Sequence, residues 1–335
     1  MKHKKDLRFI VLGTVFLFLI SACSTQQETG AAPKTPFLGG TAGLDINFLE
    51  ESPPNEVTDQ NSFPFQAVVS IKNNGETDVL ATGAKISLVG FFPSLFGANA
   101  ADLSNKQLTE DLKGRQRDSE GNIIESVQSF VTFPTDATQF NFVGSIAGNT
   151  MSIFRADVCY KYQTRATSEI CVLENQIDVA KDALCKPSEP KTIFSSSSPI
   201  QVGSFKQNVV GKDKMQFSFD LVHSGQGYVF DPAVAADCPK DPTVKRMKQD
   251  NVNIGVKTGI GTAGQLKCVG LSDQTVAGQT NGTVKLINGK RSITCTQELP
   301  PQAQRTDFKK PVDITIDFNY LASKDKEVLV KHLIN

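Results

Sequence analysis

Histidine is scarce in this sequence, and the motifs of common catalytic sites are missing. Of the three histidines, only His223 and His332 lie beyond the first 22 residues, and neither lies near a cysteine. Zinc sites need Cys and His at short spacings, and a Ser-His-Asp triad would have to use one of these two side chains. The chain contains no G-x-S-x-G, H-E-x-x-H or phosphate-binding glycine loop. We therefore expect no catalytic residue, no metal ligand and no cofactor, and we expect that the protein is not an enzyme.

The chain also lacks an excess of charge of either sign. Lysine and arginine together number 35, as do aspartate and glutamate. Residues 1–22 hold four basic side chains and one acidic one, so the remaining chain has a net charge of about −3. Binding to phosphate backbones depends on a clustered basic surface, and the sequence contains no such cluster. We expect no nucleic-acid partner.

Long hydrophobic runs are absent after residue 20. The apolar run Phe9–Ile20 follows a basic start and is shorter than the roughly 20 residues that span a bilayer. This is the layout of a secretory signal, and ISAC, at positions 20–23, resembles a lipobox in which lipid is attached to the cysteine. We expect residues 1–22 to be a signal peptide and residues 23–41 to be a lipidated Cys23 with a flexible tether. The alternatives are an ordinary signal peptide or an uncleaved anchor, with Cys23 incidental.

Six cysteines remain beyond Cys23, and an even number in an exported chain predicts disulfides. None has the C-x-x-C spacing of a redox pair, and fifteen pairings are possible. Alternation in ADVCYKY predicts a strand, and a hairpin centred on Arg165 would set Cys159 opposite Cys171, within disulfide range. A second pair would join two strand-like runs, and a third follows by elimination. These further pairs are Cys268 with Cys295 and Cys185 with Cys238.

Two pairs of segments indicate a weak tandem repeat. DVCYKYQTRATSEICV, from residue 157, aligns without a gap with TIDFNYLASKDKEVLV, from residue 315, at an offset of 158. FPFQAVVSIKNNGETDV, which begins at residue 63, compares with KMQFSFDLVHSGQGYVF, which begins at residue 214; at an offset of 150, Ala67 meets Phe217 and Gly75 meets Gly225. Both members of the second pair alternate and run into a polar turn with glycine. We interpret the matches as a duplication in which each half ends in a tyrosine-bearing hairpin; chance similarity between β-segments is the alternative.

Most of the remaining apolar segments are short and alternating, with Gly, Asn and Pro between them. This pattern indicates an all-β fold built of antiparallel sandwiches. Asn288-Gly289 predicts a two-residue hairpin turn. In an insertion of the first half, Leu103, Leu108 and Leu112 have the spacing of one short amphipathic helix.

A proline- and serine-rich stretch predicts a linker, 176–198, between two domains at 42–175 and 199–335. The segment FPFQAVVSIKNNGETDV in the first domain resembles immunoglobulin-like modules of the CARDB and APHP type, which have an N-x-G turn after an early strand. PIQVGSF and PVDITIDFNY in the second domain are similar in style. The resemblance implies two tandem immunoglobulin-like antiparallel β-sandwich domains on a prokaryotic cell-surface lipoprotein, and the whole is also similar to archaeal surface proteins.

Two further stretches are candidate contact or modification sites. GFFPSLFG, residues 90–97, is too punctuated for a regular strand and could form an exposed apolar patch. The alternative is a loop that tucks Phe92 and Phe96 onto the sandwich. Asn281 begins an N-G-T glycosylation sequon. The acidic stretch 229–242 offers Asp231, Asp237 and Asp241 as possible calcium ligands, but their spacing matches no calcium loop. The apolar patch comprises Phe91, Phe92, Leu95 and Phe96.

Together these features predict a non-catalytic, lipid-anchored protein on the extracytoplasmic face of the cell envelope. It would act as a structural, adhesion or binding module through loops or sheet edges. Its partners would be the membrane, through the N-terminal lipid, and an envelope protein or glycan. The alternative is a lipoprotein subunit of a transport or secretion assembly that binds a small ligand between its domains, which a deep, partly apolar cleft would favour.

Overall fold

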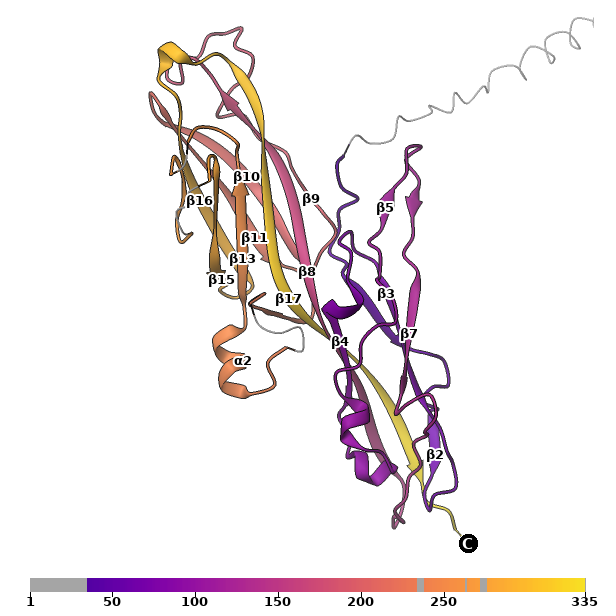
Figure 1. Ribbon diagram of the computed structural model, residues 1–335. Coiled ribbons are helices and arrows are strands. Elements are labelled where there is room, and N and C mark those ends of the chain that lie inside the picture. The colour runs from indigo at the N-terminus through magenta and orange to yellow at the C-terminus, as the bar shows by residue number, and fades with distance from the viewer. Residues whose placement is uncertain (1–34, 234–237, 263, 272–275, 335) are drawn as a thin grey trace, which may run out of the picture. The chain divides into compact units, whose positions relative to one another are not determined.

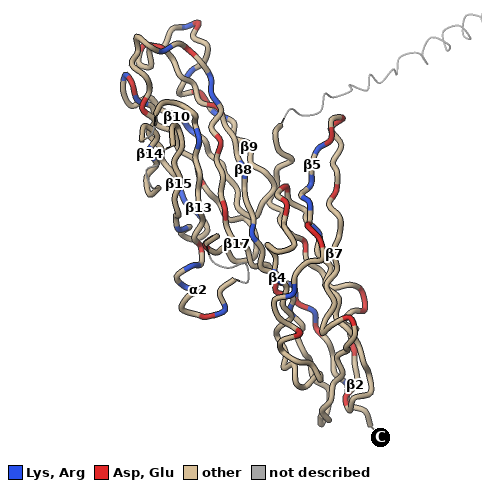
Figure 2. Tube along the Cα trace, viewed as in Figure 1, with Lys and Arg blue, Asp and Glu red and all other residues tan. Residues whose placement is uncertain are grey.

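The computed structural model describes residues 35–233, 238–262, 264–271 and 276–334, and in this part the fold is mostly β (Figure 1). The expected all-β class with antiparallel sheets is confirmed. The predicted signal peptide and Cys23 lie outside the described residues. Residues Thr35–Asn335 form one compact unit, and none of its described helices is long and apolar enough to cross a membrane. Basic and acidic residues are interspersed along the strands (Figure 2).

A ribbon of two very long strands organises the fold. β8 (Thr150–Val172) and β17 (Phe308–Lys331) pair antiparallel from Phe308↔Val172 to Val330↔Thr150. Polar and apolar residues alternate along both strands, so one face of the ribbon carries most of the buried side chains. Because β8 continues straight through Arg165, the hairpin expected there is wrong. The matching hairpin expected in residues 315–330 is wrong for the same reason.

Strands from the first half of the chain build a first lobe around one end of the ribbon. β4 pairs with β8 and β2 pairs in parallel with β17, while β1, β3 and β7 form a separate sheet in the order β1-β3-β7. Apolar side chains of both sheets meet in the core. The strands of this lobe are β1 (Leu44–Phe48), β2 (Glu56–Thr58), β3 (Ala67–Asn73), β4 (Ala84–Val89), β5 (Gln116–Arg117), β6 (Ile123–Ile124) and β7 (Gln128–Phe133). Its short 3₁₀ turns are η1 (Ala81–Gly83), η2 (Pro93–Phe96) and η3 (Ala100–Leu103).

The second lobe surrounds the other end of the ribbon. β9 pairs with β8, and β12 and β13 pair with β17, whereas a four-stranded sheet has the order β10-β11-β16-β14. The strands are β9 (Ile193–Ser195), β10 (Ile200–Gly211), β11 (Lys214–His223), β12 (Tyr228–Phe230), β13 (Asn251–Lys257), β14 (Leu266–Cys268), β15 (Gln279–Lys285) and β16 (Lys290–Glu298). The helices are α2 (Pro242–Lys248) and the 3₁₀ turn η4 (Gln302–Gln304).

The two lobes repeat one pairing pattern around the ribbon. β4 lies beside β8 as β13 lies beside β17, and the order β1-β3-β7 corresponds to β10-β11-β16. Lys161 pairs with Asn319, and these two positions differ by the same 158 residues that separate the repeated segments. An approximate twofold axis through this pair therefore exchanges β8 with β17. Each half of the chain contributes its last strand to both lobes.

The disulfides differ from two of the three expected pairs. Cys268 joins Cys295 as expected. Cys159 and Cys171 lie on one continuous strand, and twelve residues at about 3.3 Å each put them roughly 40 Å apart, far beyond disulfide reach. The pair expected by elimination is wrong as a consequence. The other two disulfides observed are Cys159–Cys238 and Cys171–Cys185.

Two local predictions have opposite outcomes. Asn288 and Gly289 both have positive φ, 51° and 74°, and Ile287 and Lys290 exchange backbone hydrogen bonds around them, so the two-residue turn is confirmed. The helix expected from the leucine spacing is wrong. η3 ends at Leu103, and Leu112 forms a β-bridge to Val79. The leucines are nevertheless buried, because extended and 3₁₀ segments also direct them into the core.

The disulfides generate the first prediction. In the chain-entropy model, a cross-link stabilises by about 4 kcal/mol for a separation of 79 residues and about 3 kcal/mol for one of 14. We expect the double substitution Cys159→Ser/Cys238→Ser to lower the free energy of unfolding more than Cys171→Ser/Cys185→Ser, as measured by urea denaturation. Peptide mapping without reduction should recover a Cys159–Cys238 cross-link. A Cys159–Cys171 cross-link would contradict the continuous β8 strand.

Candidate functional site

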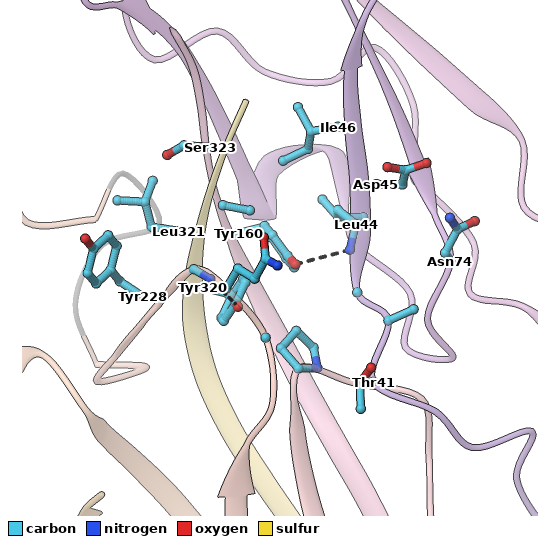
Figure 3. A pocket seen from close by; sticks show the side chains of 17 residues that line it. Thr41, Leu44, Asp45, Ile46, Asn74, Tyr160, Tyr228, Tyr320, Leu321 and Ser323 are labelled. Atoms are coloured by element: carbon cyan, nitrogen blue, oxygen red, sulfur yellow. Dashed lines mark hydrogen bonds between the residues drawn. The ribbon is translucent and has the colours of Figure 1, made fainter. Parts of the chain in front are cut away.

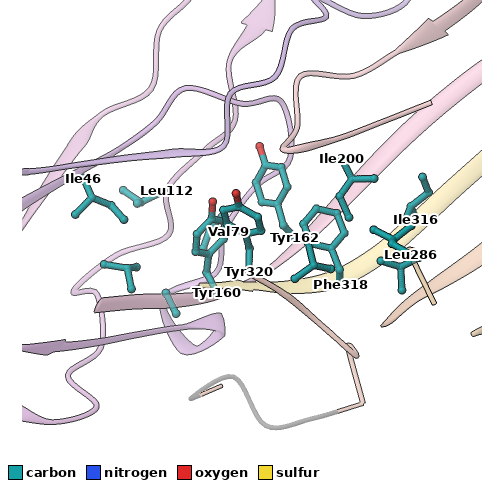
Figure 4. Close-up of a cluster of buried hydrophobic side chains, with 14 of the residues drawn as sticks. Ile46, Val79, Leu112, Tyr160, Tyr162, Ile200, Leu286, Ile316, Phe318 and Tyr320 are labelled. Atoms are coloured by element: carbon teal, nitrogen blue, oxygen red, sulfur yellow. The ribbon is translucent and has the colours of Figure 1, made fainter. Parts of the chain in front are cut away.

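Four aromatic side chains gather at the pseudo-twofold axis (Figure 4). Tyr160 and Tyr162 come from β8, and Phe318 and Tyr320 come from β17. The two members on each strand are two residues apart, so they share one face. Ring centroids lie 5.8 Å apart for Tyr160–Tyr320 and 6.1 Å apart for Tyr162–Phe318. Edge-to-face and tilted contacts at this separation contribute about 0.5–1.5 kcal/mol each beyond area burial, and they hold the centre of the ribbon in register.

Two glycines let turns approach this aromatic cluster closely. A Cβ atom on Gly75 would lie 1.8 Å from the hydroxyl oxygen of Tyr162, and one on Gly225 would lie 2.1 Å from that of Tyr320. The glycines are separated by 150 residues and the tyrosines by 158, which are the offsets of the sequence repeat. The same close contact is therefore made once in each half. Neither turn could keep its position with a side chain at the glycine.

The tyrosine hydroxyls bond to equivalent turns. The Gly227 N–H donates to the Tyr320 hydroxyl at 2.7 Å, and that hydroxyl lies 3.2 Å from His223 Nε2. The equivalent hydroxyl, of Tyr162, donates to Asn73 Oδ1 at 3.4 Å. Burial lowers the pKa of His223, which favours a neutral imidazole that can accept from Tyr320. His223 is thus bonded within a turn at the end of β11.

A groove opens beside the aromatic cluster (Figure 3). Its volume is about 590 Å³, within the roughly 300–1,000 Å³ of small-molecule sites. The first lobe contributes β1 and the residues before it, the second contributes the 225–228 turn, and β17 forms one wall. The lining mixes side-chain and backbone polar groups with apolar surface. The lining residues used below are Asp45, Tyr160, Gln226, Tyr228, Ala322 and Ser323.

Among the polar side chains of the described groove lining, Tyr160 has the lowest exposed fraction. It is fully buried, and its hydroxyl accepts a hydrogen bond from the Leu44 N–H at 3.1 Å. Burial raises the pKa of Tyr160 well above its usual value, so the phenol keeps its proton at physiological pH. Within the described part of the chain this proton has no acceptor. The Tyr160 hydroxyl thus lies beneath Gly43 in the floor of the groove.

The outer wall of the groove is aromatic and weakly charged. Tyr228 is about half exposed, and Lys245 Nζ lies 4.6 Å from the centre of its ring. Asp45 carries the one carboxylate among the lining residues that the structure describes, and it accepts a hydrogen bond from Asn47. This arrangement supplies hydrogen-bond donors, acceptors and an aromatic face. Such groups bind and orient a ligand.

The predicted apolar patch is divided between core and surface. Phe91 stacks on Phe154 with centroids 4.1 Å apart, and Phe96 is 1% exposed. Phe92 is 75% exposed and Leu95 is 43% exposed. The expected tucking of the loop is therefore right for Phe96 and wrong for Phe92. The patch as a whole does not form one surface.

The remaining sequence candidates lie apart from the groove lining. Asn281 is half-buried within strand β15 and pairs with a β13 residue, whereas a sequon is usually displayed on a loop. Asp231 pairs with Lys248 at 3.0 Å, and Asp241 caps α2. Asp237 lies outside the described residues. Within the described ranges, no three His, Cys, Asp or Glu side chains are grouped as metal ligands.

The sequence did not reveal a buried carboxylate that anchors the C-terminal end of β17. Asp59 lies 2.8 Å from His332 Nδ1 and accepts the backbone N–H groups of Leu333 and Ile146 at 2.9 and 3.1 Å. Burial alone would raise the pKa of Asp59, but the bonds from Leu333, His332 and Ile146 lower it to about 2. The two members of the pair are 273 residues apart, and only the parallel pairing of β2 with β17 brings them together.

Comparisons with known proteins provide no relative on which to base a function. No family model matches the chain, and no curated protein matches it. One solved structure is described as the complete structure of manganese lipoxygenase of Gaeumannomyces graminis and partial structure of zonadhesin of Komagataella pastoris. It aligns at 11% identity over 86% of this chain and 92% of that one, with a TM-score of 0.11, and this likeness carries no argument about fold or function.

The glycine at the aromatic cluster generates a second prediction. Gly75→Ala would place a methyl group 1.8 Å from the Tyr162 hydroxyl and 2.7 Å from the Ala42 carbonyl oxygen. We expect a loss of about 1–3 kcal/mol in the free energy of unfolding. Gly203→Ala is the matched control, because no atom lies within 4 Å of its added Cβ, and it should change stability by less than about 0.5 kcal/mol. Equal effects of the two substitutions in urea denaturation would contradict the packing argument.

The anchor of the C-terminal segment generates a third prediction. The carboxyl of Asp59 titrates at about 2 in the folded chain against 3.8 in its ordinary environment. Its contribution to stability is therefore complete above pH 4 and is lost as the pH falls towards 2. We expect Asp59→Asn to lower stability at pH 6 and to flatten the acid limb of a plot of unfolding free energy against pH. The control Asp45→Asn removes an exposed carboxylate and should leave the stability at pH 6 unchanged; an unchanged acid limb in Asp59→Asn would disprove the assignment.

Proposed function

We propose that this chain is a non-catalytic, lipid-anchored protein of the extracytoplasmic face of the cell envelope, acting as a structural, adhesion or binding module. The observation that carries this proposal is the set of three disulfides, which uses all six cysteines beyond Cys23. Structural disulfides persist in oxidising compartments and are rare in the cytosol. They support export, and the lipobox-like ISAC supports anchoring at Cys23.

The proposal includes an immunoglobulin-like origin for both lobes. Support comes from the equivalence of the β1-β3-β7 and β10-β11-β16 sheets, each combined with strands of the ribbon around an apolar core. Two-sheet antiparallel packing of this kind is the architecture of immunoglobulin-like domains. In proteins of this architecture, loops and sheet edges carry the binding function.

The groove supports a binding role within this proposal. Its lining places the exposed Asp45 carboxylate, the Gln226 amide and the Tyr228 ring around one opening. Binding sites combine a few oriented polar groups with apolar surface. Acid–base catalysis would need a second titratable group within reach of Asp45, and the described groove lining offers only tyrosines.

The same groove also favours a second candidate function. A lipoprotein subunit of a transport or secretion assembly would bind a small ligand between its lobes, and the groove takes residues from both. Native mass spectrometry of the protein purified from its host decides between the two. A stoichiometric small molecule that is lost on denaturation would favour the transport candidate.

Anchoring generates a fourth prediction. We expect the wild-type chain in the membrane fraction, starting at Cys23, with a diacylglyceryl mass and six protons gained on reduction. Cys23→Ser should move the protein to the soluble fraction or leave residues 1–22 attached, with the disulfides unchanged. Ser24→Ala is the control and should remain lipidated. An unlipidated wild-type chain with free thiols in intact-mass analysis would overturn the proposal.

A further inference from the structure

The pseudo-twofold axis relates the open groove to a position that is filled. At that position, the short strand β9 (Ile193–Ser195) pairs with β8 and is followed by Ser196 and a bend that begins at Ser197. The Ser196 N–H donates to the Arg165 carbonyl at 2.8 Å, and the Arg165 N–H donates to Ser196 Oγ at 2.9 Å. Ser196, Ser197 and Ser198 are 0%, 2% and 0% exposed. β9 is therefore an added strand on β8, and the three serines that follow it are enclosed.

A single carboxylate completes the filled position. Glu76 accepts the backbone N–H groups of Leu38, Gly39 and Ser197 at 2.8, 2.9 and 2.5 Å. Its own backbone N–H donates to the Ser197 carbonyl at 3.2 Å. Glu76 thus binds backbone N–H groups from two separate segments of the chain. The side chains at this position are small enough to be buried without a pocket.

The open groove holds the equivalents of both recognition residues. Arg165 corresponds to Ser323 at the offset of 158, and Glu76 corresponds to Gln226 at the offset of 150. Ser323 and Gln226 both line the groove. Both are exposed, whereas the serines bound at the filled position are buried. The groove therefore has residues at both equivalent positions, with an amide in place of the Glu76 carboxylate, and it lacks the bound segment.

The edge of β17 at the groove is unpaired. The Leu329 N–H donates to Asn55, and the Lys331 carbonyl accepts from Asp59, so odd-numbered residues here direct their backbone groups away from β8. Ser323 is also odd-numbered, so its backbone N–H and C=O point away from β8. Among the described strands, β12 pairs with β17 at 319–321 and β2 pairs at 329–331, and none pairs between these positions. The Ser323 N–H and C=O are therefore available to an added strand.

The segment of the first half that is equivalent to β9 does not lie in the open groove. Leu44 and Ile200 begin the equivalent strands β1 and β10, so residues 37–40 are the counterpart of residues 193–196. Leu38 and Gly39 bond to Glu76, and the Gly40 carbonyl accepts from Ser198. The first half thus sends its leading segment to the filled position. The open groove is left without the strand that the symmetry would supply.

We propose that the open groove binds an extended segment of a partner protein as an added β-strand on the Ser323 edge. The bound segment donates a backbone N–H to the Ser323 carbonyl and contacts the Gln226 amide, as the N–H groups of Ser196 and Ser197 bond to the Arg165 carbonyl and the Glu76 carboxylate. Its residues are small, because Gly43 and Gly225 bring backbone close to the tyrosines at the floor. The site is continuous with the β12 and β2 pairings on the same edge. Strand addition of this kind obtains affinity from main-chain bonds.

The test uses a peptide that reproduces the filled position. We expect a labelled acetyl-TIFSSSSPI-amide, residues 192–200 of this chain, to bind the disulfide-intact chain saturably in fluorescence anisotropy. Ala322→Phe, which fills the groove, and Ser323→Pro, which removes the outward N–H, should each weaken binding at least tenfold. Ser323→Ala is the matched control and should bind like the wild type. The peptide TIFSPSSPI, which lacks the N–H corresponding to Ser196, should bind at least tenfold more weakly.

Amide exchange gives a second readout on the unaltered chain. The peptide should slow hydrogen exchange of residues 321–325, and the proline-substituted control TIFSPSSPI should not. Absence of saturable binding by the wild type, or equal binding by Ala322→Phe, would overturn the proposal. This inference rests on the proposed binding role. Because the test does not use membrane anchoring, its failure would leave the Cys23 result intact, and a lost anchor would leave the peptide result intact.

Discussion

The pairing of β8 with β17 is the constraint on which the rest of the structure depends. Each strand enters one lobe with its first residues and the other lobe with its last, so neither sheet system is complete without both strands. A one-residue slip in the ribbon would turn every buried side chain of a strand to the opposite face. The aromatic cluster at the axis opposes such a slip, because its four rings interlock across the two strands.

The pseudo-symmetry is informative where it fails. The contacts of Gly75 with Tyr162 and of Gly225 with Tyr320 repeat faithfully, whereas the leading segments of the two halves do not. Both lie near the same side of the axis, where Glu76 binds backbone from residues 38, 39 and 197. The result is one enclosed position and one open groove with related walls. The opening exists because the leading segment of the first half binds at Glu76 and leaves its symmetry-equivalent position in the groove empty.

Sequence patterns identified the elements but not how they are joined. Alternation around Tyr160 and Tyr162 correctly predicted a strand with these side chains on one face, and Asn288-Gly289 correctly predicted its turn. The same alternation continues through Arg165 without a Gly, Pro or Asn, and the absence of any breaker was the signal that β8 runs straight. The expected hairpin followed from the cysteine spacing alone. Pairing of Cys159 with Cys238, and of Asp59 with His332, depends on contacts across 79 and 273 residues, which no local pattern encodes.

The large sequence separation between β8 and β17 has a consequence for how the chain folds. Every pair in the ribbon joins residues at least 136 positions apart, and folding slows as contacts become less local. β17 comes after all the other strands of both lobes in the described chain, so neither lobe can close before β17 has been synthesised. A chain that crosses a membrane from its N-terminus would keep both half-built lobes open until β17 has crossed. During that interval, the exposed edges of β8, β4 and β13 would be the surfaces that a chaperone must cover.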